Sequence, residues 1–169
     1  MDTANYYHAE VGSLIRQIKD PVIAGFILGK MNRGRELGID VSVTPASYLP
    51  ESAQAEETHE LVTVLGNLLE NAMEALDGRP DPEIVLTFDY DEGRLRCTVW
   101  DNGKGIEPAA LSQIFEHGFS TKGSRRGIGL FLVRQSLEKL GGSIECLSAL
   151  GKGTRFIVSL PYTCKENSL

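Results

Sequence analysis

The chain has 169 residues, a net charge of −6 and an apolar fraction of 41%, which is typical of one globular domain with a hydrophobic core. The acidic charge argues against a nucleic-acid-binding surface, and no apolar run approaches the roughly 20 residues that a membrane helix needs. No signal-peptide pattern is present, and Cys97, Cys146 and Cys164 lack metal-ligand spacing, which favours reduced thiols in a cytoplasmic compartment.

The amino-terminal part of the chain predicts two helices. Apolar residues recur at helical spacing over 11–18, which indicates the first helix. Asp20 and Pro21 then supply an N-cap and a first-turn proline for a second helix that is expected to end at Gly38. The apolar residues within 22–31 of this second helix could face a partner helix.

A short strand over 39–44 and an exposed connection over 45–57 lead to the clearest predicted helix, 58–76. Asn67 and Asn71 lie one turn apart beside its stripe of leucines, so their amides converge on one point. Amide oxygens can help to hold a magnesium ion whose other ligands are waters and substrate phosphates. The alternative is a pair of solvated amides on an exposed helix face.

A predicted hairpin delivers the residue around which the candidate site is built. Alternating apolar residues indicate strands over 84–90 and 94–100. The second strand ends at Asp101, and Gly103 and Gly105 remove two β-carbons immediately afterwards. A carboxylate in this position could accept a hydrogen bond from the exocyclic amine of a purine while the glycines make room for the ring. The alternative is an ordinary turn after a strand.

The next segments predict a place for phosphate. A short helix over 108–114 is followed by 115–126, where glycines, hydroxyl groups and three cations predict a mobile, basic loop. The last long helix opens at 127–130 and stops at Gly141. Phosphate is stabilised at a helix N-terminus that follows basic, glycine-rich chain, because free amides and the helix dipole point at it. An ordinary loop leading into a helix is the alternative.

Strands over 143–148 and 154–160 complete the predicted fold, and the tail, 162–169, is expected to fray. The order of elements predicts an α/β (α+β) fold, a two-layer sandwich in which a mixed, mostly antiparallel sheet packs on helices, with an amino-terminal helical segment. The sequence contains no P-loop, dinucleotide-binding fingerprint or serine-nucleophile elbow, and its histidines lack metal-ligand spacing.

Several segments in fixed order resemble the ATP-binding catalytic domain of sensor histidine kinases, in the superfamily that includes gyrase, the Hsp90 chaperones and MutL. The resemblance spans roughly 37–161. The segments that match the N box, the first glycine box, the F box and the second and third glycine boxes are 67–72, 101–105, 115–119, 127–130 and 151–154.

The resemblance implies that the chain binds ATP and Mg²⁺. It implies that Asp101 binds adenine N6, that Asn71 is a magnesium ligand assisted by Asn67, and that 115–126 forms a lid over the phosphates. It assigns catalytic roles to Asn67, Asn71 and Lys122. The nucleotide-binding residues that it implies are Asn71, Asp101, Gly103, Gly105, Ile106, Phe115, Thr121, Lys122, Arg126, Gly127, Gly129 and Leu130.

Two positions, one in the N box and one just after it, bear on the reaction. Many kinases of the family have a lysine or arginine where this chain has Glu74, so the phosphate charge must be met elsewhere, with Lys122, Arg125 and Arg126 as candidates. The hydrolysing branch of the superfamily has a glutamate general base where this chain has Asn67, which cannot take a proton. Phosphotransfer to an imidazole needs no such base, so the sequence favours transfer over hydrolysis. A nucleotide-binding module without turnover remains a further alternative.

Residues 18–38 resemble the segment before the catalytic domain in sensor kinases for citrate and four-carbon dicarboxylates. The implied division is 1–38 as the end of the dimerisation and acceptor region, 39–161 as the catalytic domain and 162–169 as a tail. The acceptor histidine is expected upstream, because His8 lacks the family's basic motif. The implied partners are the chain's own upstream acceptor-helix domain, a second copy in a homodimeric receptor, and a response regulator. This part is expected to be the cytoplasmic domain of an inner (plasma) membrane protein, without nucleic-acid or membrane contact.

Overall fold

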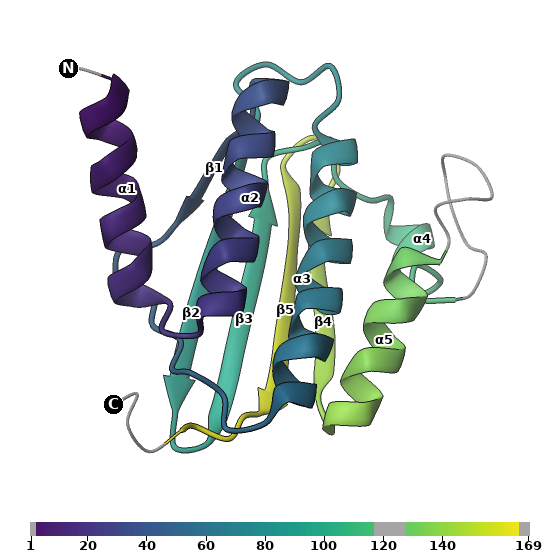
Figure 1. The fold of residues 1–169 in the computed structure, drawn as a ribbon. Coiled ribbons are helices and arrows are strands. Elements are labelled where there is room, and N and C mark those ends of the chain that lie inside the picture. The colour runs from purple at the N-terminus through teal and green to yellow at the C-terminus, as the bar shows by residue number, and fades with distance from the viewer. Residues whose placement is uncertain (1–2, 117–127, 166–169) are drawn as a thin grey trace.

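The computed structural model describes residues 3–116 and 128–165. Its strands form one five-stranded sheet in the order β1-β2-β3-β5-β4, and the long helices lie against one face of that sheet (Figure 1). β1 is parallel to β2, and the other pairings are antiparallel, which confirms the predicted mixed sheet in a two-layer sandwich. The strands are β1 (Asp40–Val43), β2 (Glu83–Asp91), β3 (Arg94–Asp101), β4 (Ser143–Ala149) and β5 (Gly153–Pro161).

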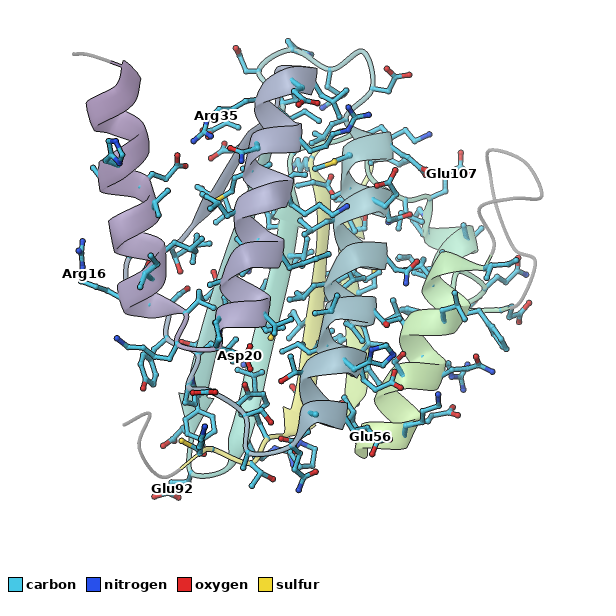
Figure 2. All side chains as sticks on the ribbon, in the orientation of Figure 1. Arg16, Asp20, Arg35, Glu56, Glu92 and Glu107 are labelled. Carbon is cyan, nitrogen blue, oxygen red and sulfur yellow. The ribbon has the colours of Figure 1, made fainter. Side chains whose placement is uncertain are left out.

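α2, α3 and α5 begin and end close to the residues that the sequence predicts, whereas α1 begins at Thr3, well before the predicted 11–18, and α4 ends at Leu111 instead of 114. At the start of α2 the side chain of Asp20 accepts hydrogen bonds from the amides of Val22 and Ile23, at 3.0 and 3.3 Å (Figure 2). Gly38, with φ +75°, ends the same helix in the left-handed conformation. Both predicted ends of α2 are thereby confirmed. The helices are α1 (Thr3–Gln17), α2 (Pro21–Leu37), α3 (Ala55–Ala75), α4 (Pro108–Leu111) and α5 (Gly129–Leu140).

The apolar face of α2 is part of the core of this chain. Ile23 and Ile27 are fully buried and Met31 is 5% exposed, whereas Val22 stays 58% exposed. These buried residues belong to the same hydrophobic cluster as the leucine stripe of α3 and the inward side chains of the sheet. The face that was predicted to be able to meet a partner helix therefore packs within its own chain, where α2 contacts the helices α1 and α3. The functional division at residue 38 therefore crosses a continuous core, and it stays a prediction.

The connection 45–57 is more buried than its composition suggested. Leu49 is fully buried, its amide donates to Gln17 O at 2.9 Å, and its carbonyl accepts from Lys19 N at 2.8 Å. The amide of Tyr48 donates to Phe88 O at 2.9 Å. The prediction of an exposed connection is wrong for this middle part, because its backbone groups pair with the α1–α2 junction and with β2.

The beginning of the tail is also packed. Tyr162 is 2% exposed, and its hydroxyl donates to the carbonyl of Pro50 at 2.7 Å. The amide of Thr163 donates to the carboxylate of Glu57 at 2.9 Å, and the amide of Lys165 donates to Glu51 O at 2.9 Å. Fraying from residue 162 is therefore wrong for 162–165, whose backbone is tied to the connection before α3 and to Glu57 in the first turn of that helix. Among the described helices, none has both the length and the hydropathy of a membrane span.

Candidate functional site

The carboxylate of Asp101 ends β3 and is buried, with 1% of the residue exposed. In the sheet Asp101 lies between Ile84 of β2 and Thr154 of β5. Its Oδ1 accepts a hydrogen bond from the amide of Gly103 at 2.9 Å. Burial raises the pKa of Asp101 to about 6, while backbone hydrogen bonds from Gly103 and Thr154 act in the opposite direction. The site therefore contains a desolvated acceptor whose ionised form is held by backbone amides.

The loop after Asp101 passes between two other segments with no room for side chains at its glycines. A β-carbon at Gly103 would lie 2.7 Å from both Ala75 O and Asp101 Oδ1. Gly105 has φ +78°, and a β-carbon there would lie 2.2 Å from Ala149 O. The two glycines are required by close approach to the end of α3 and to β4. We call residues 102–106 the glycine loop.

Hydrogen bonds tie the glycine loop to neighbouring turns at this end of the sheet. The amide of Gly151, in the β4–β5 turn, donates to Lys104 O at 2.8 Å. Arg79, in the loop after α3, reaches from its Nη2 to Asn102 O at 3.4 Å and to Gly151 O at 3.3 Å. The Nε of Arg79 is buried, without a hydrogen-bond partner among the described residues. Arg79 is not recognisable from the sequence, because bonds to carbonyl groups leave no signal in a side-chain pattern.

The two asparagines of the N box lie on successive turns of α3, which runs beside α5 (Figure 1). The Nδ2 of Asn67 donates to Thr63 O at 2.8 Å, one turn back along the helix. Its Oδ1 lies 3.3 Å from the position that a β-carbon of Gly129 would occupy. Asn71 is partly exposed one turn further on. The structure thus brings Asn67 and the first residue of α5 together.

Three of the predicted apolar residues of the site lie at the margin of the core. Ile106, Phe115 and Leu130 are each partly buried against the hydrophobic cluster. The ring of Phe115 meets the ring of Phe156 edge to face, with centroids 6.3 Å apart and planes at 78°. Phe156 follows Thr154 by two residues on β5, so the two side chains point to the same face of the sheet. Phe115 and Phe156 therefore form an apolar surface next to Thr154, which is the strand partner of Asp101.

The remaining predicted residues fall elsewhere. Thr121, Lys122, Arg126 and Gly127 lie outside the described residues, as does most of the predicted lid. Over residues 3–116 and 128–165, no group of three or more histidine, cysteine, aspartate or glutamate side chains is arranged to hold a metal ion.

These features define the class of protein domain to which the chain belongs. An open α/β sandwich with a buried strand-end carboxylate, a tightly packed glycine loop beside it and an asparagine facing a helix start is a nucleotide-binding domain. The chain belongs to the family described as Histidine kinase-, DNA gyrase B-, and HSP90-like ATPase, which matches residues 56–163. It is an ATP-binding domain of that family.

Comparison with known proteins agrees with this family. The chain is 48% identical over 162 residues to the sensor histidine kinase DcuS of Escherichia coli (strain K12), covering 96% of this chain and 30% of DcuS. It is 39% identical over 153 residues to a probable C4-dicarboxylate sensor kinase of Halalkalibacterium halodurans, covering 89% of this chain and 29% of that kinase. The chain thus spans less than a third of the length of these relatives.

A solved structure has the same architecture. Full-length ShkA, determined in complex with AMPPNP, superposes with a TM-score of 0.74 at 27% sequence identity, over 88% of this chain and 31% of ShkA. The predicted resemblance to the catalytic domain of sensor histidine kinases is confirmed by the family and by these relatives.

Proposed function

We propose that this chain binds Mg²⁺-ATP and transfers the γ-phosphoryl group to a histidine on the upstream helical domain of a sensor histidine kinase. The observation that supports this most directly is the buried carboxylate of Asp101, held by the amide of Gly103 at 2.9 Å. A desolvated acceptor is stabilised by a donor that can reach it, and the exocyclic amine of adenine is such a donor. The relatives named as sensor kinases support the phosphotransfer reaction.

In this proposal the two ends of the nucleotide are bound by different groups. Asp101 accepts from adenine N6, while Gly103 and Gly105 allow the backbone to approach the ring, and Ile106, Phe115 and Leu130 contact its faces. The phosphates are met by Thr121, Lys122, Arg126 and Gly127 and by the start of α5 at Gly129. A helix N-terminus stabilises an anion through its free amides.

Magnesium fits the amide oxygens of α3. The Nδ2 of Asn67 is used by Thr63 O, so its Oδ1 is the atom left to bind a ligand. Asn71 lies one turn closer to the end of α3 and is partly exposed. We assign Asn71 as the ligand and Asn67 as its assistant, with waters and phosphate oxygens completing the coordination. When bound, the ion neutralises charge on the phosphates.

Asn67 also favours transfer over hydrolysis. An amide cannot accept a proton at neutral pH, so Asn67 cannot activate water as a general base. A histidine acceptor supplies its own neutral nitrogen as nucleophile, and positioning with charge stabilisation is sufficient. An ATP-hydrolysing domain or a nucleotide-binding module without turnover is the alternative.

The full-length protein is proposed to be a homodimeric membrane receptor for citrate or a four-carbon dicarboxylate, acting on a response regulator. The name of the Halalkalibacterium relative and the resemblance of 18–38 to that group of kinases support the ligand class. In this arrangement the catalytic domain lies in the cytoplasm.

A phosphotransfer assay tests the proposal. The chain is incubated with magnesium, γ-labelled ATP and a separate fragment that carries the upstream acceptor helix. We expect acid-labile, base-stable label on the fragment, none on the chain itself, and loss of transfer in Asn71→Ala. Release of free phosphate without label on the fragment would favour an ATP-hydrolysing domain. Binding of ADP with neither free phosphate nor labelled fragment formed would favour a nucleotide-binding module without turnover.

A further inference from the structure

Ser148 lies in β4 with its hydroxyl between the glycine loop and the β4–β5 turn. The amide of Ile106 donates to its Oγ at 2.8 Å. The same oxygen lies 3.0 Å from Gly153 O and 2.9 Å from Thr154 Oγ1. One side chain therefore contacts three backbone or hydroxyl groups that belong to two different segments.

The three contacts use the full capacity of the hydroxyl. A serine hydroxyl has one hydrogen to donate and two lone pairs. It donates to the carbonyl of Gly153 and accepts from the amide of Ile106 and the hydroxyl of Thr154. Alanine would remove all three interactions, whereas threonine at 148 would keep the oxygen. This arrangement predicts a function for the hydroxyl beyond that of a polar residue on an edge strand.

The groups joined by Ser148 lie on both sides of Asp101. Ile106 closes the glycine loop that follows Asp101 in the chain. Thr154 is the strand partner of Asp101, and its amide contributes a hydrogen bond to that carboxyl group. Gly153 lies so close to Asp101 that a β-carbon there would be 2.0 Å from Asp101 O. Ser148 thus couples the loop after the carboxylate to the strand beside it.

Without the Ser148 hydroxyl the glycine loop would lose a tie near its end. The bond from Gly151 N to Lys104 O would still hold its middle. Ile106 N would have to find water or remain unpaired, which costs free energy for a partly buried amide. The expected result is a loop that keeps its path but samples a wider range of distances from Asp101.

We propose that Ser148 is a positioning residue for the nucleotide, which fixes the spacing between Asp101 and the glycine loop and thereby sets the preference for adenine over guanine. This inference rests on the proposed nucleotide function. Guanine has a carbonyl oxygen where adenine has the amine. The carboxylate of Asp101 therefore repels guanine only if the ring is held so that this oxygen lies next to the carboxylate. A loosened loop lets the ring shift, and discrimination between the two bases falls.

The test is calorimetric titration of Ser148→Ala, Ser148→Thr and wild type with ADP and with GDP. We expect Ser148→Ala to bind ADP about three- to tenfold more weakly and to lose a similar factor in its ADP-to-GDP preference. Ser148→Thr is expected to stay within about twofold of wild type in both. Ser143→Ala, on the same strand with an exposed side chain, is the matched control and should change neither.

Amide hydrogen exchange gives a second readout that a general loss of stability does not produce. In Ser148→Ala the amide of Ile106 should exchange faster while amides in the middle of α3 keep their protection. If Ser148→Ala does not fold, Ser148→Cys takes its place, with the same expected weakening because sulfur is a poor acceptor. A folded variant with unchanged ADP affinity and unchanged ADP-to-GDP preference overturns the inference alone. A wild-type chain that binds neither nucleotide overturns the proposed function as well.

Discussion

At the scale of single residues, Asp101 combines a binding role with a cost to the fold. The carboxylate is 1% exposed, and burial raises its pKa to about 6 from the ordinary value of 3.8. Desolvation disfavours the charged form, which is the form that accepts a hydrogen bond from adenine. The same residue is therefore expected to contribute to nucleotide affinity and to destabilise the free protein at neutral pH, a common compromise at binding sites.

Replacing Asp101 by alanine should weaken ADP binding by about 1–3 kcal/mol, because the amine of adenine would be left without its partner in a buried site. Calorimetry with ADP measures this loss. Asp89→Ala, an exposed carboxylate on β2, is the control and should bind ADP like wild type. Undiminished affinity in folded Asp101→Ala would rule out the assignment of the adenine site.

The raised pKa also predicts how stability depends on pH. Since the folded-state pKa of about 6 exceeds the ordinary value of 3.8, the protonated form contributes stability that is fully present below about pH 4 and is lost as the pH rises through about 6. The side chain in Asp101→Asn is neutral at every pH, so this variant should lack the loss. Urea denaturation of both proteins across this range should show the wild type losing about 1–3 kcal/mol relative to the variant. A difference that does not change with pH would contradict the raised pKa.

At the scale of elements, the site is made where three connections meet. The loop after α3, the glycine loop and the β4–β5 turn contact one another through Arg79, Gly105 and Gly151. None of these segments is held by regular strand pairing, so close backbone approach and side-chain bonds to carbonyl groups keep them together. Their geometry is consequently sensitive to small changes in volume.

Gly105→Ala should both destabilise the chain and weaken ADP binding. The residue has φ +78°, and its new methyl group would lie 2.2 Å from Ala149 O, so the loop would have to move. We expect a loss of at least about 2 kcal/mol in the free energy of unfolding, measured by urea denaturation. Gly25→Ala is the matched control, because its β-carbon would meet nothing within 4 Å on α2. That variant should be neutral or more stable by up to about 1 kcal/mol, and equal effects of the two changes would argue against the close approach at Gly105.

At the scale of the whole molecule, the α1–α2 junction, the start of α3 and the beginning of the tail are joined at the end of the sheet opposite the site. The hydroxyl of Thr58 donates to Asp20 Oδ2 at 2.9 Å, which ties the α1–α2 junction to the first turns of α3. Glu57, one residue earlier, accepts from the amide and hydroxyl of Thr163. α3 therefore runs from this junction to the end of the sheet where Asp101 lies, and one helix connects the two regions.

Two substitutions at Tyr162 separate ring packing from hydrogen bonding in the tail. Tyr162→Ala removes a buried ring that meets the ring of Tyr90 edge to face, with the ring centroids 5.9 Å apart. This change should cost about 3–5 kcal/mol of unfolding free energy. Tyr162→Phe keeps the ring and loses the bond to Pro50 O, so it should cost about 1 kcal/mol. Chemical denaturation measures both. Wild-type stability in Tyr162→Ala would mean that the tail does not belong to the core.

The sequence by itself determined the elements and most of the site motifs. Period and capping are local properties, so Asp20 and Gly38 predicted the ends of α2, and alternation predicted that β3 would end at Asp101. The order of motifs then indicated the family. The roles of the nucleotide-binding residues remain predictions, and those of the lid lie outside the described chain.

Only the tertiary structure decided which surfaces are covered by distant segments of the same chain. The sequence predicted an exposed connection over 45–57 and a frayed tail, and it left open which helix the apolar face of α2 meets, because a local pattern does not reveal which distant segment will cover it. The bonds from Arg79 to Gly151 O and from Ile106 N to Ser148 were invisible for the same reason, since each joins a side chain to a backbone group tens of residues away. Backbone carbonyls and amides occur at nearly every position, so residue types carry no signal for such contacts, and only the path of the folded chain selects them.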